Sequence, residues 1–190
     1  MKPAASSPTK TEWPTVAIVG VGLIGGSIGL ALQARRLAGR VIGIGRSAAS
    51  LAAARRAKVV TETAVDLAAA AAEADLVVVA TDVGTITTLL DRIDEAVRPG
   101  TLITDAGSTK ASIVAAWEKR RRTRCGRFVG SHPIAGSHKS GPAAADAALF
   151  EGRIAVVTPA RATPAADAEA IGGFWAALGS TVFMIDPKEH

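Results

Sequence analysis

The chain has 190 residues, of which 48% are hydrophobic, 21% are charged and only one is cysteine. This length suits one hydrophobic core, and a single cysteine excludes an internal disulfide and indicates a reducing, cytoplasmic compartment. The net charge of +5 includes a basic run at Lys119–Arg122 and Arg124, which lacks the interleaved aromatic residues typical of a nucleic-acid surface. We interpret that run as the cationic end of a helix, and we expect no nucleic-acid partner.

The N-terminal segment is polar, with no apolar stretch that would indicate a secretory signal, and residues 1–14 are predicted to form a disordered tail. Val16–Leu32 is an uncharged apolar run at the short limit for a membrane span, but it contains five glycines. A buried strand that turns into a glycine-packed helix explains the run better. We therefore expect no membrane association.

Strand-like apolar runs then alternate with helix-like segments along the chain. We predict strands at Val16–Gly20, Val41–Ile44, Lys58–Val60, Leu76–Ala80, Thr101–Thr104, Arg127–Val129, Ile154–Thr158 and Thr181–Ile185. We predict helices at Ile24–Arg36, from Ser47 onward, and at Thr85–Val97, Lys110–Arg122 and Ala165–Leu178. This order predicts an α/β fold, a Rossmann-like doubly wound and mainly parallel sheet with helices on both faces, over residues 15–185. The long irregular excursion at Ser131–Gly152 is expected to be functional.

The first predicted strand leads into a glycine pattern, GVGLIG, at Gly20–Gly25. Gly20 permits a tight turn, Gly22 lets the backbone approach a pyrophosphate, and Gly25 allows close packing of helix on strand. The following helix N-terminus offers unpaired N–H donors for phosphates. A strand before the pattern and a helix after it predict a dinucleotide site rather than a glycine-packed turn alone.

The end of the second predicted strand bears on which dinucleotide binds. An NAD site places Asp or Glu here to bind the ribose 2′-hydroxyl, but this chain has Gly45, Arg46 and Ser47. A guanidinium can hold a phosphate in a bidentate manner, and Ser47 and the next helix N-terminus add donors. The sequence therefore favours NADP over NAD. The alternative is a surface arginine beside a permissive glycine.

A second cluster of polar residues follows the strand at Thr101–Thr104. Ser108 lies where the chain enters a helix, so it is expected either to cap that helix or to hydrogen-bond a substrate hydroxyl or a histidine. Asp105 is expected to hold the turn rather than to transfer a proton. Cys125 has no histidine or cysteine partner at ligand spacing, and we expect no metal site.

The segment Gly130–Gly136, GSHPIAG, places His132 between glycines where a strand end is predicted to run into a loop. Histidine exchanges protons near neutral pH, the glycines admit a ligand close to the main chain, and Pro133 fixes the backbone. This composition is not typical of a helix or a core strand. We hypothesise a site here, with an ordinary polar loop as the alternative.

The glycine pattern, the segment Asp105–Lys110, the segment Gly130–Gly136 and Lys139–Gly141 together resemble prephenate and arogenate dehydrogenases of tyrosine biosynthesis. The resemblance extends over residues 15–190, and its specific part is His-Pro-Ile-Ala-Gly. It implies an NAD(P)-dependent oxidative decarboxylation in which His132 accepts a hydrogen bond or the proton from the ring hydroxyl of the substrate. By the same resemblance Ser108 orients that hydroxyl and the histidine, and the substrate, prephenate or arogenate, also lies near Ser137 and His138.

The cofactor residues expected from the motifs and the resemblance together are Gly20, Gly22, Leu23, Ile24, Gly25, Arg46, Ser47, Ala80, Thr81, Asp105 and Gly107. Three positions depart from the family pattern. Gly45 stands where an acidic residue is frequent, which agrees with NADP, and Asp82 stands where proline is usual. His138 replaces a common acidic residue, so it is either a substrate neighbour or an exposed loop residue.

The resemblance also implies a helical dimerisation domain, separate from residues 1–190, which supplies an arginine for the substrate carboxylate. Residues 186–190 resemble the start of the hinge to that domain. We expect either a fragment or a partner domain on a separate chain, with a homodimer formed only when that domain is present. The alternatives are a different Rossmann-type NADP oxidoreductase and a non-catalytic NADP-binding module.

Overall fold

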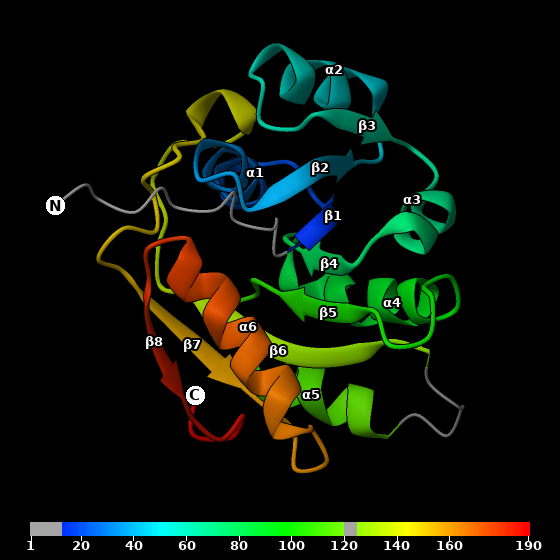
Figure 1. Cartoon of the computed structure of the whole chain (residues 1–190), viewed down its shortest axis with the longest axis vertical. Helices are drawn as coiled ribbons and strands as arrows, with labels where there is room; N and C mark the ends of the chain where they lie inside the picture. Colours follow the sequence, from blue (N-terminus) through cyan, green and yellow to red (C-terminus); the bar gives the residue numbers. More distant parts are fainter. Residues whose placement is uncertain (1–12, 120–124) are drawn as a thin grey trace, which may run out of the picture.

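The computed structural model describes residues 13–119 and 125–190, which form one eight-stranded sheet flanked by helices (Figure 1). The strand order is β3-β2-β1-β4-β5-β6-β7-β8, and all neighbours are parallel except β6 and β7. The strands are β1 (Trp13–Val19), β2 (Ala38–Ile44), β3 (Glu62–Ala64), β4 (Leu76–Val79), β5 (Leu102–Asp105), β6 (Arg127–Pro133), β7 (Ile154–Thr158) and β8 (Thr181–Met184).

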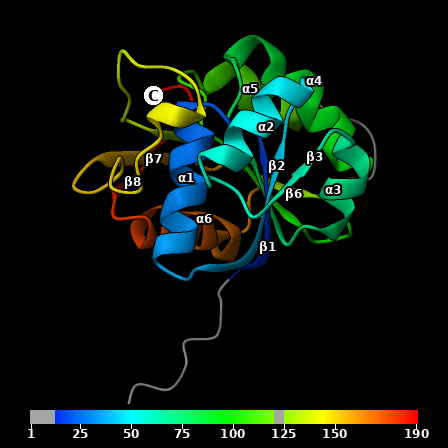
Figure 2. The ribbon, with the colours of Figure 1, turned by 90° about the horizontal axis from the view of Figure 1, so that it is seen from above.

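Helices cover both faces of this sheet, and two buried clusters hold them there. One cluster joins the sheet to α1, α2 and α6, and the other joins it to α3, α4 and α5. Figure 2 shows α1 and α6 on one side and α4 and α5 on the other. The helices are α1 (Leu23–Ala34), α2 (Ala48–Arg56), α3 (Leu67–Glu73), α4 (Val83–Asp94), α5 (Ala111–Glu118) and α6 (Ala165–Ala177).

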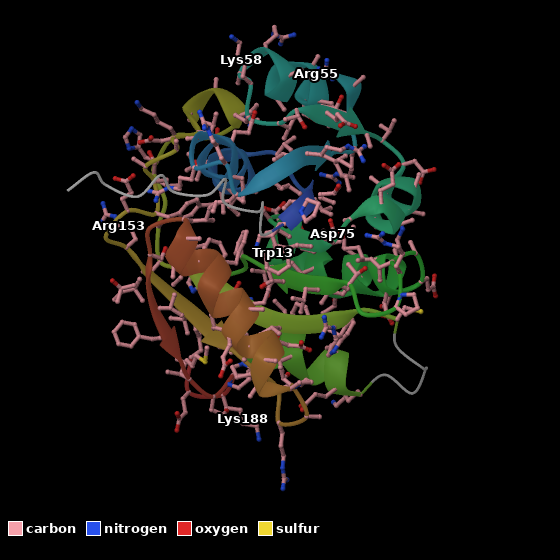
Figure 3. The ribbon with its side chains drawn as sticks, in the orientation of Figure 1. Trp13, Arg55, Lys58, Asp75, Arg153 and Lys188 are labelled. Carbon is pink, nitrogen blue, oxygen red and sulfur yellow. The ribbon has the colours of Figure 1, made fainter. Side chains whose placement is uncertain are left out.

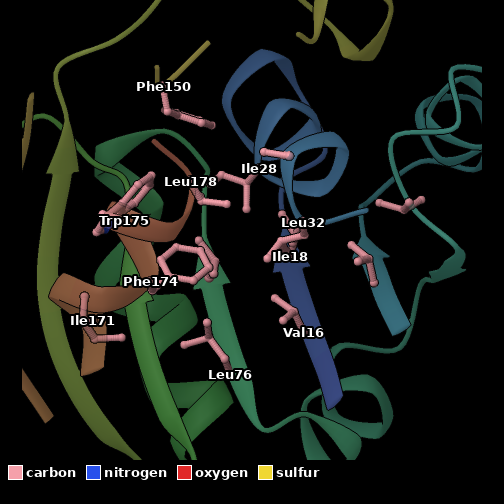
Figure 4. Packing of buried hydrophobic residues seen from close by; sticks show 14 of the residues in the cluster. Val16, Ile18, Ile28, Leu32, Leu76, Phe150, Ile171, Phe174, Trp175 and Leu178 are labelled. Carbon is pink, nitrogen blue, oxygen red and sulfur yellow. The ribbon is translucent and has the colours of Figure 1, made fainter. Parts of the chain in front are cut away.

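Successive side chains of the central strands lie on opposite faces of the sheet, and both faces are buried, which explains the apolar runs of these strands. On β1, Val16 and Ile18 belong to the cluster under α1 and α6, whereas Ala17 and Val19 belong to the cluster on the opposite face. Figure 4 shows the first pair facing α1 and α6 across the core. A strand that is buried on both faces favours apolar side chains on both of them, and the predicted doubly wound fold is confirmed.

The order of the strands places the glycine-rich turn at a functionally important point. Strand β1 pairs with β2 on one side and β4 on the other, so the chain reverses its direction of travel across the sheet beside β1. Ligands of open α/β sheets bind outside the carboxyl ends of strands at such a switch point. The turn after β1 and the end of β4 meet there.

The predictions differ from the structure at three places. The third strand lies at Glu62–Ala64 and not at Lys58–Val60, because Lys58 adopts a left-handed φ of 54° and the Val59 carbonyl lies against Gly29 of α1. Helix α3 was not predicted, although Asp66 caps it by accepting from the N–H groups of Ala68 and Ala69. Strand β1 begins at Trp13, so the last two residues of the predicted tail belong to the sheet.

Other parts of those predictions lie outside the described residues. These are the remainder of the tail and the basic run from Arg120 to Arg124, with the predicted extension of the fifth helix to Arg122. In the described part, α5 ends at Glu118.

The excursion between β6 and β7 is packed against α1 and includes a short 3-10 helix, Pro142–Ala144. The Ser27 hydroxyl of α1 accepts a hydrogen bond from the Asp146 N–H at 2.9 Å, and Ala145 fills the space above Gly26. Charged side chains such as Arg55, Arg153 and Lys188 extend from the outside of the molecule (Figure 3). Nowhere in residues 13–119 and 125–190 is there a helix of the length and apolarity needed to cross a bilayer.

Candidate active site

The turn from β1 into α1 depends on the absence of side chains at its glycines. Gly20 has a φ of 94°, and a Cβ there would lie 2.6 Å from the Ala80 carbonyl oxygen. A Cβ on Gly25 would lie 2.0 Å from the Gly20 carbonyl oxygen, so neither position accepts a side chain. A Cβ on Gly22 would meet nothing within 4 Å, which leaves the backbone open on that side. Two closed positions and one open position fit a turn that packs tightly and admits a phosphate.

The N-terminus of α1 supplies the donors for this turn. The first helical bond runs from the Gly26 N–H to the Gly22 carbonyl, at 2.9 Å, so the N–H groups of Leu23 and Ile24 precede it. Such groups attract a phosphate through hydrogen bonding and the positive end of the helix dipole. The residues present therefore fit a dinucleotide pyrophosphate.

Two neighbouring strands extend this edge. Ala80 and Thr81 follow β4 directly, and the Thr81 methyl group lies beside the Gly20 turn. Thr81 accepts a hydrogen bond from the Thr85 hydroxyl at 3.0 Å, while Asp82 is exposed and makes no side-chain cap on α4. The structure thus brings the predicted cofactor residues of β1 and β4 together.

The end of β2 lies on the other side of the same turn. The Gly20 N–H donates to the Ile44 carbonyl at 2.9 Å, which couples the two strand ends. Ser47 is the N-cap of α2 and accepts from the Ser50 N–H at 3.1 Å, at the point where this helix was predicted to begin. Arg46 is exposed beside it. No carboxylate occupies Gly45, the position from which an NAD ribose is bound in this fold.

His132 lies within strand β6 and not in a loop, so that prediction was wrong. Residues Gly130–Pro133 pair antiparallel with β7, and His132 stands opposite Val156. Gly130 is required there because a Cβ would lie 2.7 Å from the Thr158 hydroxyl. The site histidine is therefore carried by a paired strand, at the carboxyl end of β6.

The surroundings of His132 keep its imidazole neutral. Burial lowers the pKa of His132 from 6.5 to about 4, and electrostatic interactions with His190 and Lys110 contribute to this shift. Its Nδ1 lies 3.0 Å from Nε2 of His190. A neutral imidazole at neutral pH can accept a hydrogen bond or a proton, which is what the predicted role requires.

A buried polar cluster lies directly behind this strand. The Lys110 ammonium pairs with the Asp105 carboxylate, and both side chains are fully buried. Lys110 also donates to the Ser131 carbonyl at 3.0 Å, and Asp105 accepts from the Ser131 N–H at 3.2 Å. The Ser131 hydroxyl in turn accepts from the Trp175 indole at 2.8 Å. Burial raises the pKa of Asp105 and lowers the pKa of Lys110, because both charges are removed from water.

The Asp105 carboxylate is therefore held by hydrogen bonds and an ion pair within the protein. It accepts from the Gly107 N–H at 2.9 Å, so it holds the turn as predicted. Gly107 is buried, and a Cβ there would lie 2.6 Å from the Ile86 side chain. The Ala106 N–H donates to the Val79 carbonyl at 2.9 Å, which places this turn beside the end of β4.

Ser108 is exposed and does not cap α5, which corrects one of its two predicted roles. The N-cap position of α5 is Lys110, which makes no side-chain cap. The hydrogen bond found for the His132 ring is to His190 and not to Ser108. Ser137 and His138 are exposed on the loop after β6, where Ser137 accepts from the Lys139 N–H at 3.2 Å.

Sequence reasoning missed four residues of this region, namely Lys110, Ser131, Trp175 and His190. Lys110 belongs to a segment that was recognised, but an ammonium is expected at the surface, so nothing local indicated its burial. Ser131 was seen only as part of the histidine segment. Trp175 and His190 are 44 and 58 residues from their partners, and no pattern in the sequence connects them.

A glycine turn of this shape, at the switch point of a doubly wound sheet, defines the class of dinucleotide-binding domains. A family model described as "Prephenate dehydrogenase, nucleotide-binding domain" matches residues 28–184. The chain belongs to the prephenate dehydrogenase family, and the resemblance predicted from its motifs is confirmed.

Individual relatives agree with this assignment. The chain is 35% identical to the prephenate dehydrogenase of Bacillus subtilis (strain 168), over 93% of this chain and 47% of that protein. Its structure is similar to that of Aquifex aeolicus prephenate dehydrogenase in complex with hydroxyphenyl propionate and NAD+, with a TM-score of 0.86, 28% identity, and coverage of 93% of this chain and 61% of that one. Synechocystis arogenate dehydrogenase is similar with a TM-score of 0.83, 26% identity, and coverage of 93% and 61%. The chain spans about half the length of the first of these relatives.

Proposed function

We propose that this chain is the cofactor-binding part of an enzyme that oxidatively decarboxylates prephenate or arogenate. The single observation that carries the proposal is His132, a neutral imidazole at the carboxyl end of β6 in the same sheet as the glycine turn. A proton acceptor and a dinucleotide site at the same edge of one sheet are the combination that oxidation of a hydroxyl group needs. The Aquifex aeolicus relative was solved with an aromatic ligand and NAD+, which supports this class of substrate and cofactor.

In this proposal the bound nicotinamide supplies a hydride acceptor. His132 receives the proton of the substrate hydroxyl while hydride leaves the ring carbon that carries this hydroxyl. The bond from the ring to its carboxylate breaks, and the electron pair left by carbon dioxide makes the ring aromatic. Ser108, exposed near the N-terminus of α5, orients the hydroxyl. Since aromatisation provides the driving force, the protein has mainly to position the substrate and hold a neutral base.

Replacement of His132 by asparagine in the full-length gene product tests this proposal. We expect turnover to fall by about 10²- to 10⁴-fold, the usual contribution of a general base, while cofactor affinity stays nearly unchanged. Turnover would be followed by the absorbance of the reduced nicotinamide, and cofactor affinity by calorimetric titration. A large loss of cofactor affinity would instead make His132 a structural residue. If the unmodified protein binds the cofactor but turns over neither substrate, the protein is a non-catalytic binding module and not the proposed enzyme.

We propose further that the cofactor is NADP rather than NAD. Gly45 offers no carboxylate for a ribose 2′-hydroxyl, and the exposed Arg46 stands next to the N-terminus of α2, where a 2′-phosphate would find further donors.

The Arg46→Ala variant separates the two cofactors. It should weaken NADP binding by about tenfold or more, because a charge-assisted pair to phosphate is lost, and change NAD binding little. Arg55→Ala, near the C-terminus of α2, is the matched control, because it removes one positive charge at the opposite end of this helix. Equal losses for NADP and NAD in the Arg46→Ala titrations would refute the NADP preference.

A further inference from the structure

The site of His132 contains a second histidine that the proposed reaction does not yet use. Nδ1 of His132 and Nε2 of His190 are 3.0 Å apart, and the two rings are tilted by 54° with their centroids 5.0 Å apart. Two imidazole nitrogens at this distance share one proton, so one ring donates and the other accepts. The contact therefore ties the tautomer of one histidine to the tautomer of the other.

A defined turn carries His190 to this position. Strand β8 pairs with β7, and the pairing continues through a hydrogen bond from the Ile185 N–H to the Val157 carbonyl at 3.1 Å. Asp186 then closes a turn, because its carboxylate accepts from the Lys188 N–H at 2.8 Å and its carbonyl accepts from the Glu189 N–H at 3.0 Å. The same carbonyl accepts from the His190 N–H at 3.3 Å. Lys188 extends outward from this turn (Figure 3), while His190 is directed back to β6.

The other charged groups near His132 are already paired. Lys110 approaches from the N-terminus of α5 and Asp105 from β5, but these two bind each other and the Ser131 backbone. Of the hydrogen bonds found for the described residues, the one to His190 is that which engages the His132 ring. His190 is thus placed to decide which nitrogen of His132 carries the proton.

We propose that His190 is a positioning residue that accepts a hydrogen bond from the Nδ1–H group of His132. This contact keeps the lone pair on Nε2 of His132 free for the substrate hydroxyl. This inference rests on the proposed function for its catalytic consequence, because only a proton acceptor needs that tautomer. The opposite arrangement, in which His190 donates, would put the proton of His132 on Nε2 and block acceptance there. The arrangement matches the general rule that the partner of one ring nitrogen sets the state of the other.

Two substitutions separate hydrogen bonding from ring packing. His190→Phe keeps an aromatic ring against His132 but cannot accept a hydrogen bond from it. His190→Gln loses the ring but offers an amide oxygen that accepts from Nδ1. Glu189→Gln, an exposed neighbour in the same turn, is the matched control.

The first readout is the tautomer, measured on this chain by long-range ¹H–¹⁵N NMR of its three histidines. His132→Asn identifies the His132 signals by their loss. We expect the His132 proton on Nδ1 in the unmodified chain, in His190→Gln and in Glu189→Gln, and a redistribution toward Nε2 in His190→Phe. A His132 proton on Nε2 in the unmodified chain, or an unchanged tautomer in His190→Phe, overturns the proposal.

The second readout is turnover of the full-length gene product. We expect kcat to fall about tenfold in His190→Phe, which corresponds to the loss of a hydrogen bond of about 1.4 kcal/mol, with the KM for the cofactor unchanged. His190→Gln should recover kcat to within about threefold, because a single neutral hydrogen bond is restored. Equal losses in both variants would show that the ring, and not its acceptor, matters. If the tautomer behaves as expected but no dehydrogenase activity exists, the proposed function fails while the positioning role of His190 stands.

Discussion

Two parts of the same sheet edge are built by opposite means. At the end of β1, the shape of the turn depends on missing side chains, since Gly20 and Gly25 accept no Cβ and Gly22 leaves the backbone open. The ends of β5 and β6 are instead held by polar side chains removed from solvent, since Asp105, Lys110 and Ser131 are buried. The first part suits a phosphate, which needs close approach to backbone N–H groups. The second suits a proton acceptor, which needs a fixed orientation.

The two parts differ in the free energy that it costs to bury their polar groups. A close-packed glycine turn costs little to bury, because its polar groups are backbone groups that bond within the sheet or face a ligand. A buried ion pair is costly to desolvate, and its attraction does little more than offset that cost. What the pair of Asp105 and Lys110 secures is position, because both side chains bind the backbone of Ser131, next to His132.

The largest expected effect comes from breaking that pair. Lys110→Met should lower the free energy of unfolding by about 3–5 kcal/mol, because the Asp105 carboxylate is left buried without its cation. Chemical denaturation followed by circular dichroism measures this value.

The double variant Lys110→Met with Asp105→Asn serves as the control. It removes the orphaned charge, so it should be more stable than Lys110→Met alone. If Lys110→Met costs less than about 1 kcal/mol, which is typical of an exposed pair, the contrast between the two parts of the edge disappears.

A smaller effect is expected at the glycine turn, where two alanine substitutions give a matched comparison. Gly25→Ala places a Cβ against the Gly20 carbonyl and should destabilise the protein by about 1–3 kcal/mol, as overpacking does. Gly22→Ala meets no atom within 4 Å and should change stability by less than about 0.5 kcal/mol, yet weaken cofactor binding about tenfold or more by blocking the open side of the turn. Thermal unfolding and cofactor titration measure the two quantities. Similar behaviour of both variants would contradict the distinction between closed and open glycines.

The fold was predictable because its signals are local. Each strand buried on both faces is a short apolar run, and the glycine pattern lies between the strand and the helix that give it meaning. The errors arose where a weak local signal competed with tertiary contacts. Val59 and Val60 look like a strand, but Val59 is buried against α1 and Val60 against Gly43 of β2. The three residues of β3 are only partly buried.

The candidate site was predictable only in part. His132 was found from its neighbours, but the same glycines and proline argued against a strand, and only the pairing with β7 makes Gly130 fit there. The cofactor turn could be predicted position by position. The polar cluster could not, because its contacts join residues as far apart as Ser131 and Trp175, and a lysine carries no mark of burial in the sequence.

The smallest expected effect is a pH dependence of stability that belongs to the His132 side of the edge. Burial, His190 and Lys110 lower the pKa of His132 to about 4, from its ordinary value of 6.5 in an unfolded chain. Between these values the unfolded state binds a proton that the folded state does not, so the free energy of unfolding falls as the pH falls through this window. Above it the contribution is constant, and solvent keeps the effect small because His132 is partly exposed.

The difference in unfolding free energy between the unmodified chain and His132→Asn isolates this contribution, because the carboxylates titrate in both proteins. We expect the difference to be level above the window and to change steadily within it, in the direction that disfavours the unmodified chain in acid. His190→Phe removes one of the three causes of the shift, so its own decline should be confined to a narrower range of pH. A difference that is independent of pH would mean that His132 is as solvated as in the unfolded chain, and the contrast between an open phosphate turn and a partly buried proton acceptor would be lost.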